Sequence, residues 1–308
     1  MENSEFENAR FAPSPSGRMH LGNVYTALLS WLYARKSGKR WLVRIEDLDK
    51  QRCKKEYAEQ LLDDLCFLGL EWDGEIVWQS KRTDFYKKAF DRLFDAGLLY
   101  PCFCRRADIL ASSAPHENLV YAGTCRNFCA EKIAELSKIR RPSYRVKVFG
   151  ESTFFDEHYG FQKIDLQKDA GDFIVRRADG NFSYQLAVCV DDADSHVVQI
   201  MRGRDLLTST HQQLFLYRVL NFTPPQYAHI PLLVSEDGRR LSKRERDLDF
   251  GFLREKFDAK QIVGKILHLC GFLEKPCPLE LCEAISIFDL KKLPKNDISI
   301  SRFFENSI

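Results

Sequence analysis

Two prolines, Pro13 and Pro15, interrupt the chain directly after its first apolar segment. Proline lacks a backbone N–H and has a fixed φ, so no helix interior or central strand can contain the run Pro13–Gly17. Residues 10–12 therefore form a short strand that must end there. The apolar spacing over residues 24–32 predicts a helix that begins after the run. The N-terminal region is thus committed to a strand, a tight loop and a helix.

The same alternation continues along the chain. Apolar spacing predicts a strand at 41–45, a helix at 54–68 and a helix from Thr83, which we expect to act as its cap, to Gly97. It returns later, with a strand at 197–200, a helix at about 206–219 and a strand at 230–234. Alternating strands and helices are typical of an α/β fold, a parallel sheet with helices on its faces.

The pattern changes between these two parts. Four segments after Pro101 look like strands, at 144–149, 152–155, 173–177 and 182–186, and Asp179-Gly180 is a good hairpin turn between the last two. We interpret this region as an inserted, mostly antiparallel module. The predicted organisation is a first half of the α/β domain at 1–100, the insertion at 101–190, the second half at 191–258 and a short helical C-terminal extension at 259–308.

Composition excludes several classes of protein. The 46 basic and 44 acidic residues give a net charge of only +2, so a nucleic-acid partner would have to meet a local basic patch. No apolar run is long enough to cross a bilayer, and the acidic, polar N-terminus does not resemble a signal peptide. We therefore expect a cytoplasmic protein with no membrane partner.

The first candidate for chemistry is His20-Leu21-Gly22-Asn23, where the proline loop meets the helix. A helix N-terminus offers free N–H groups and a partial positive charge, which favour phosphate. Gly22 would allow a nucleotide to approach the backbone closely. His20 could donate a hydrogen bond to phosphate oxygens, and its alternative interpretation is a histidine in a surface loop.

The second candidate is Arg240-Leu241-Ser242-Lys243-Arg244, which follows the turn at 236–238. A lysine on a loop suits stabilisation of the charge that builds up on a triphosphate. The alternative is a solvated basic hairpin tip.

Taken together, the two segments point to a family. Residues 10–17 followed by His20–Asn23 resemble the first signature of class I aminoacyl-tRNA synthetases, in their glutamyl branch in particular, and Arg240–Arg244 resembles their lysine-serine-lysine loop. The segments 44–49, 184–188 and 202–207 also look like that branch, so the resemblance covers residues 10–246. It implies a Rossmann-type catalytic domain. Asn23 departs from a common second histidine, and Arg240 and Leu241 replace a lysine and a methionine.

The resemblance also implies roles for individual residues. His20 and Lys243 would be catalytic, as charge stabilisers, and ATP would contact His20, Gly22, Asn23, Arg240, Leu241, Ser242, Lys243 and Arg244. Glutamate would contact Arg10, Phe11, Ala12, Pro13, Ser14, Glu46, Tyr184 and Arg202.

This assignment of the pocket is chemically sensible. A substrate with two carboxylates and one ammonium group calls for two arginines and one acid. In the resemblance, Arg10 pairs with the side-chain carboxylate of glutamate and Glu46 holds its ammonium group. The alternative for Arg10 and Arg202 is a structural salt bridge with Glu46, Asp191 or Asp205.

A cluster of cysteines predicts one structural zinc ion. Cys102-Phe103-Cys104 with Cys125 suits tetrahedral coordination. The fourth ligand stays open: zinc chemistry in general favours Cys129 or His116, whereas the resemblance favours Tyr121, four residues before Cys125. The alternative is a set of incidental cysteines in a reducing compartment.

The acceptor follows from what the chain lacks. A full glutamyl-tRNA synthetase has a long anticodon-reading region, for which the stretch after the second signature leaves no room. The chain in this respect resembles the truncated glutamyl-Q branch, which places glutamate on the queuosine base at the wobble position of tRNA(Asp). This implies L-glutamate, ATP with Mg2+, and tRNA(Asp) carrying queuosine as partners of a monomer. The alternatives are a glutamyl-tRNA synthetase without its anticodon domain, a non-catalytic tRNA-binding module, and another adenylate-forming enzyme that acts without tRNA.

Overall fold

A seven-stranded sheet organises the computed structural model, which describes residues 7–105, 120–235, 238–239 and 248–304. Its strand order is β3-β2-β1-β9-β10-β6-β7. All neighbours pair in parallel except β6 and β7, which form an antiparallel hairpin at the edge. The strands are β1 (Asn8–Phe11), β2 (Arg40–Ile45), β3 (Val77–Trp78), β6 (Glu151–Asp156), β7 (Gly160–Asp165), β9 (Val197–Gly203) and β10 (Gln226–Ile230). The predicted α/β class with a mostly parallel sheet is confirmed.

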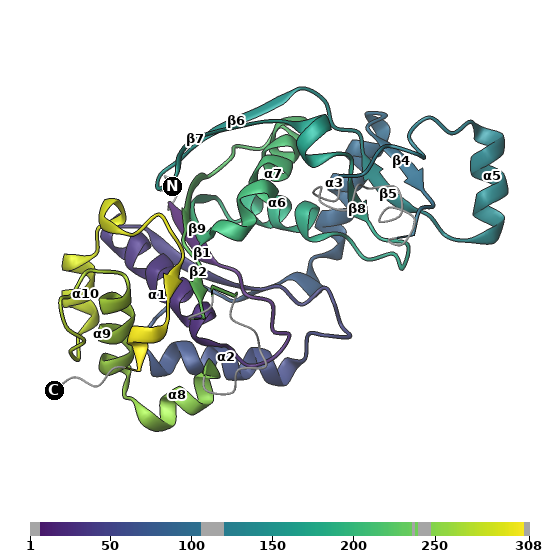
Figure 1. Cartoon of the computed structure of the whole chain (residues 1–308). Coiled ribbons are helices and arrows are strands. Elements are labelled where there is room, and N and C mark those ends of the chain that lie inside the picture. The colour runs from purple at the N-terminus through teal and green to yellow at the C-terminus, as the bar shows by residue number, and fades with distance from the viewer. Residues whose placement is uncertain (1–6, 106–119, 236–237, 240–247, 305–308) are drawn as a thin grey trace, which may run out of the picture.

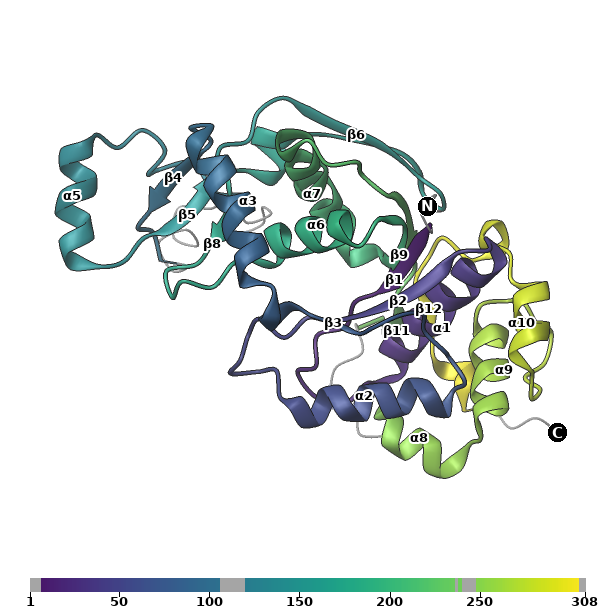
Figure 2. The ribbon, with the colours of Figure 1, turned by 180° about the vertical axis from the view of Figure 1, so that it is seen from behind.

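Helices pack beside this sheet in two groups, seen on either side of β1, β2 and β9 in Figures 1 and 2. One core joins α1 to the C-terminal helices, and a second joins α3, α6 and α7. The first group is α1 (Leu21–Lys36), α2 (Lys55–Phe67), α8 (Phe250–Lys256), α9 (Ala259–Leu269) and α10 (Leu281–Ile287), and the second is α3 (Thr83–Asp95), α6 (Tyr184–Asp194) and α7 (Leu207–Leu220). None of the helices in the described ranges has the length and apolar character needed to span a membrane.

A smaller antiparallel sheet, β4-β5-β8, lies away from the main one. Its strands are β4 (Leu99–Cys102), β5 (Ser143–Val146) and β8 (Phe173–Arg176), and α5 (Ala130–Ile139) extends beyond them at the end of the molecule in Figure 1. The hairpin β6–β7 comes from the same stretch of chain but joins the main sheet beside β10. The four-part division of the chain stays a prediction.

The strand predicted at 182–186 is wrong. Phe182 forms a single isolated bridge with Arg176, across the predicted turn at Asp179-Gly180, and then the chain turns into α6. Ser183 caps this helix by accepting a hydrogen bond from the N–H of Leu186 at 3.5 Å. A capping serine outweighs the short alternation of apolar and polar residues that suggested a strand.

Two boundaries also differ from the prediction. The strand expected at 230–234 is broken at Pro231, so β10 ends at Ile230 and Leu233–Val234 form a separate β11. β11 pairs in parallel with β12 (Ile298–Ser299), so the C-terminal extension is not purely helical. Thr83 is the first residue of α3 and not its cap, because Arg82 occupies the cap position without a side-chain hydrogen bond.

Candidate active site

A cavity of about 510 Å3 opens at the carboxyl ends of β1, β2 and β9, three neighbouring parallel strands. We call it the first cavity. Ligands of α/β proteins bind at this edge of the sheet. Every residue predicted to contact glutamate lines it, namely Arg10, Phe11, Ala12, Pro13, Ser14, Glu46, Tyr184 and Arg202. His20, Gly22 and Asn23 line it as well, so the predicted glutamate contacts and the described part of the predicted ATP contacts border one cavity.

Arg10 is held in place by a carboxylate. Its Nε and Nη2 donate to the two carboxylate oxygens of Asp192, at 3.2 and 3.3 Å. Asp192 also accepts from Nη1 of Arg44, and Arg44 donates through Nη2 to Glu46 at 3.2 Å. All four side chains are buried. The structural ion pair considered for Arg10 thus exists, but with Asp192 rather than with Asp191 or Glu46, and it leaves Nη1 of Arg10 for another acceptor.

The pKa values of the two acids of this network shift in opposite directions. For Glu46, burial is the main cause and raises the pKa, although Arg44 and Arg10 lower it in part. For Asp192, burial also acts to raise the pKa, but Arg10 and Arg44 together hold it below its ordinary value. Asp192 is therefore a permanent anion that fixes two arginines, whereas Glu46 is a carboxylate that lacks full compensation of its charge.

Arg202 sits in a neutral setting. Its Nη2 donates to Thr210 Oγ1 at 2.7 Å and to Gln213 Oε1 at 2.8 Å, and its Nε donates to His229 Nε2 at 3.2 Å. His229 in turn binds Asp156 through Nδ1 at 2.6 Å. Burial lowers the pKa of His229 despite this carboxylate, which is consistent with a neutral ring whose Nε2 accepts from Arg202.

One nitrogen of Arg202 has no partner. Nη1 is buried and makes no hydrogen bond, and Arg202 has no ion pair with any residue in the described ranges. A buried cationic donor without an acceptor is costly, so this nitrogen calls for an acceptor that the described residues do not supply. The first cavity therefore contains a guanidinium that is poised to accept an anion.

The other end of the first cavity is the N-terminus of α1. His20 is the N-cap: its Nδ1 accepts from the N–H of Gly22 at 3.1 Å, and its own N–H donates to Asn23 Oδ1 at 3.1 Å. A neutral ring with an accepting Nδ1 carries its proton on Nε2, where it is a donor. A Cβ on residue 22 would lie 3.0 Å from Cε1 of His20, which accounts for glycine at this position.

The segment Arg240–Arg244 lies outside the described residues, and this includes Lys243. Its flanks are informative. Leu233, before it, lines the first cavity, and Asp249, after it, forms a β-bridge with His20. The described residues on its two sides therefore border the first cavity and the N-terminus of α1.

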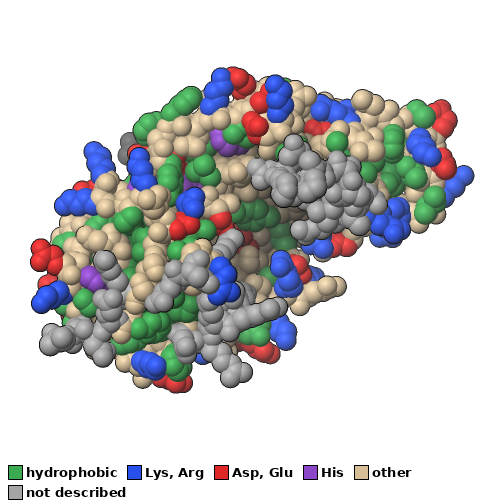
Figure 3. All heavy atoms as spheres, in the orientation of Figure 1, with side chains coloured by type: hydrophobic (Ala, Val, Ile, Leu, Met, Phe, Trp, Pro, Cys, Tyr) green, Lys and Arg blue, Asp and Glu red, His purple; other side chains and the backbone are tan. Residues whose placement is uncertain are grey.

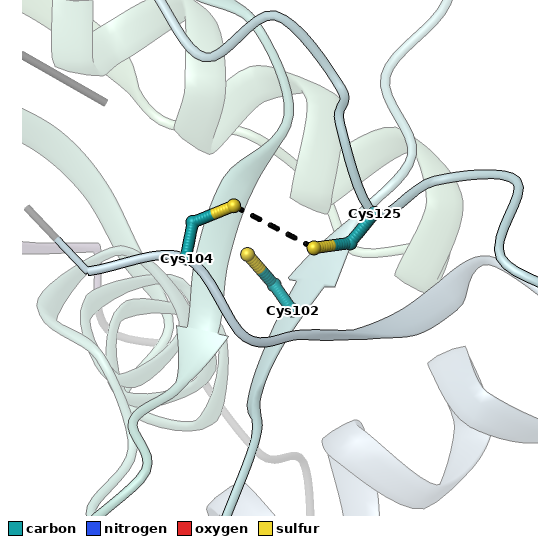
Figure 4. Close-up of side chains that lie close together, drawn as sticks. All are labelled: Cys102, Cys104 and Cys125. Carbon is teal, nitrogen blue, oxygen red and sulfur yellow. Dashed lines mark hydrogen bonds between the residues drawn. The ribbon is translucent and has the colours of Figure 1, made fainter. Parts of the chain in front are cut away.

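The predicted zinc ligands converge near β4. The Sγ atoms of Cys102, Cys104 and Cys125 lie within 4.8 Å of one another, and those of Cys104 and Cys125 are 3.6 Å apart (Figure 4). Tyr121 Oη lies 3.4 Å from Cys102 Sγ and 3.6 Å from Cys104 Sγ, and it accepts from the N–H of Cys125 at 2.9 Å. Cys129 is exposed and lies outside this cluster. His116 is not among the described residues.

The chemistry of this cluster fits a metal ion. Burial opposes ionisation of Cys102, yet hydrogen bonds from Tyr121 and Arg145 lower the pKa of its thiol below the ordinary value. Thiolates are the form that binds zinc, and three of them with one oxygen can supply a tetrahedral set. Three cysteines and Tyr121 could therefore hold one ion.

Sequence reasoning missed two residues of the site, Arg44 and Asp192, and it considered Asp191 only as an ion-pair partner of Arg10 or Arg202. Asp191 accepts hydrogen bonds from Gln79, Arg82 and Tyr86, and so connects α6 to α3. A signal was present, because the two adjacent acids follow the apolar run Leu186–Val190 on what is now known to be a helix. Acids next to a buried face are rarely buried unless they are paired.

Comparison with known proteins places this geometry in a family. The model for the catalytic domain of class I tRNA synthetases (E and Q) matches residues 8–299. A protein of Symbiobacterium thermophilum named glutamyl-Q tRNA(Asp) synthetase is 42% identical over 306 residues, which cover 94% of this chain and 95% of that relative. A protein of the same name from Nitratidesulfovibrio vulgaris is 40% identical, over 92% of this chain and 93% of its own.

Solved structures agree on the fold. A glutamate-tRNA synthetase from Elizabethkingia anophelis superposes with a TM-score of 0.82 at 24% identity, and the match covers 96% of this chain and 68% of that chain.

Proposed function

The chain belongs to the class I tRNA synthetase catalytic-domain family of the glutamate and glutamine enzymes, and from this premise we propose that it activates L-glutamate with ATP and transfers it to queuosine in tRNA(Asp). The observation that carries the proposal is the pairing, in one cavity, of Arg202 with its unpartnered Nη1 and of Glu46 with its raised pKa. Together they ask for a ligand with a negative and a positive group. The relatives named glutamyl-Q tRNA(Asp) synthetase supply the acceptor.

In the proposed complex, each charged group of glutamate meets a complementary side chain. Nη1 of Arg202 and Nη1 of Arg10 bind carboxylate oxygens, with Arg10 on the side-chain carboxylate, and Glu46 binds the ammonium group. Tyr184 lines the same space, where burial raises the pKa of its phenol and keeps it a neutral donor. These contacts hold the substrate at three points and leave one α-carboxylate oxygen to react.

The reaction needs positioning rather than proton transfer. An α-carboxylate oxygen of glutamate attacks the α-phosphorus of ATP, the bond to the bridging oxygen breaks, and pyrophosphate leaves with the electron pair. Nε2–H of His20 and the positive end of the α1 helix dipole would stabilise the phosphate charge, and Lys243 would add its ammonium group. Mg2+ would accompany the phosphates as part of the nucleotide substrate.

In the second half-reaction, a hydroxyl of the queuosine cyclopentenediol attacks the activated carbonyl. The new ester bond forms, the bond from that carbonyl carbon to the phosphate oxygen breaks, the hydroxyl proton passes to the departing phosphate group or to water, and AMP leaves. The cavity opens at the sheet edge, so an RNA base can enter it from outside.

The cysteine cluster has a structural role in this proposal. Cys102, Cys104, Cys125 and Tyr121 would hold one zinc ion, which would tie the end of β4 to the segment that leads into α5. The zinc ion would in this way hold the insertion in position beside the RNA. No chemical step of the reaction would depend on the ion.

Glutamate-dependent ATP–pyrophosphate exchange without tRNA tests the first half-reaction, and transfer of labelled glutamate to tRNA(Asp) with and without queuosine tests the second. We expect exchange without RNA and transfer only to the queuosine form. The absence of exchange would refute the enzyme proposal. Exchange followed by charging of tRNA(Glu) alone would replace it with a glutamyl-tRNA synthetase. Exchange that survives Lys243→Ala unchanged would remove the role given to that lysine.

A further inference from the structure

A second cavity, of about 410 Å3, lies beside the first. The loop Pro13–Gly17 separates the two, because Pro13, Ser14 and Ser16 line the first cavity and Pro15 lines the second. The rest of its wall comes from the segment between β2 and α2 and from residues 78–81 after β3, both found near the labels β3 and α2 in Figure 2. It is therefore built at the same carboxyl edge of the sheet, one loop away from the activation chemistry.

The second cavity is basic. Four lysines line it, Lys50, Lys54, Lys55 and Lys81, against the one carboxylate of Asp47. That carboxylate is already used, since it accepts from the N–H and Oγ of Ser80 at 2.8 and 2.6 Å.

Most of this positive charge is uncompensated. Lys55 pairs with Glu59 at 3.1 Å, but Lys50, Lys54 and Lys81 have no ion pair within the part of the chain that the structure describes. This local concentration stands out on a protein of net charge +2, whose lysines and arginines are otherwise interspersed with acids over the face in Figure 3. Unpaired lysines around a hollow suit phosphate groups.

The cavity also contains one large aromatic surface, Trp78. The indole is half-buried and packs against the main core, and its strand pairs with β2 through the register Trp78–Ile45. The ring is thus held by the sheet while it lines the cavity. A fixed aromatic ring with cations around it is the usual way to bind an unpaired nucleotide, by stacking on the base and neutralising the backbone.

We propose that the second cavity binds one unpaired nucleotide of the acceptor RNA, close to the nucleotide that receives glutamate. Its base stacks on Trp78, and its phosphates lie among Lys50, Lys54 and Lys81. This inference rests on the proposed function, because it assumes an RNA acceptor at the first cavity. It assigns a strand path across the loop Pro13–Gly17, with neighbouring nucleotides on its two sides.

The test uses the full-length protein and tRNA(Asp) carrying queuosine. Three variants are compared: a double variant that combines Lys54→Gln and Lys81→Gln, and the single variants Trp78→Ala and Trp78→Phe. The matched control is Lys275→Gln, at an exposed lysine that lines neither cavity. Dissociation constants are measured at several salt concentrations, and ATP–pyrophosphate exchange is measured without tRNA.

We expect the double lysine variant to bind the tRNA at least about tenfold more weakly. The negative slope of log association constant against log salt concentration should become shallower by roughly 1.4 to 1.8, since each lost phosphate contact contributes about 0.7 to 0.9. Trp78→Ala should weaken binding by at least about fivefold, and Trp78→Phe should restore it in part. Exchange should persist in the lysine variants.

If the lysine variants bind tRNA(Asp) with the affinity and salt slope of the wild type, the inference is overturned. The proposed function would still stand in that case, provided that the wild type carries out exchange and transfer. A wild type that exchanges but binds no tRNA(Asp) would refute the acceptor, and the inference with it. If Trp78→Ala unfolds, Trp78→Phe and Trp78→Leu decide: equal tRNA affinity of these two folded variants excludes stacking.

Discussion

The unpartnered Nη1 of Arg202 gives the sharpest prediction for the first cavity. In Arg202→Lys, one ammonium group replaces a guanidinium whose other two nitrogens are committed to Thr210, Gln213 and His229. A lysine cannot both satisfy these acceptors and reach the substrate. One hydrogen bond to a charged group contributes about 1.5 to 3 kcal/mol, so glutamate should bind roughly 10- to 150-fold more weakly.

The assay is ATP–pyrophosphate exchange at saturating ATP, with the KM for glutamate as the readout. The KM for ATP should stay within about twofold, because the hydrogen bonds of Arg202 go to Thr210, Gln213 and His229 and none goes to the N-terminus of α1. Arg177→Lys is a matched control: it changes the same residue type at a half-exposed ion pair with Asp179, and Arg177 does not line the cavity. A glutamate KM that rises less than threefold in Arg202→Lys, or a parallel rise for ATP, would refute this reading of the orphaned nitrogen.

Three further predictions concern the supporting network and the metal cluster. Asp192→Asn should lower the free energy of unfolding by about 3 to 5 kcal/mol, because it leaves the buried guanidinium of Arg10 without a carboxylate and removes one of the carboxylates around Arg44. A loss below about 1 kcal/mol in urea unfolding would contradict this. The glutamate KM should increase as pH falls through the raised pKa of Glu46, because only the ionised form binds ammonium. Glu46→Gln removes this carboxylate but leaves the ionisable groups of glutamate unchanged, so its KM for glutamate should be high at every pH. If the KM of this variant still depends on pH, a group other than Glu46 causes the dependence. Metal analysis should find about one zinc per chain, lost in Cys104→Ser and kept in Cys129→Ser, and the reverse pattern would move the site.

The sequence predicted the parts of the fold that depend on local pattern. The proline loop, the helix that begins at Leu21 and the strand over residues 41–45 all appear as expected. Predicted glutamate contacts such as Arg10 and Glu46 meet because parallel strands end at one edge, a rule that operates without knowledge of the partners.

Long-range pairing was beyond the reach of such patterns. Asp192 meets Arg10 across 182 residues of chain, and it does so from a helix that begins at a serine cap within an apparent strand. The place of β6 beside β10 likewise depends on strand order, which no local spacing encodes. The sequence predicted which residues line the first cavity, but it did not predict the residues that hold them in place.

The pairing of β11 with β12 makes the C-terminal residues part of the structure that supports the first cavity. Ile298 and Ile300 donate to the carbonyls of Leu232 and Val234 at 2.9 and 3.0 Å, and Asp297 accepts from the N–H of Leu232 at 2.9 Å. Leu232 and Leu233 line the first cavity. β12, the last strand among the described residues, thus supports the wall of the first cavity at Leu232 and Leu233. A chain that ends before Asp297 would lose this support, although it would keep every predicted site residue.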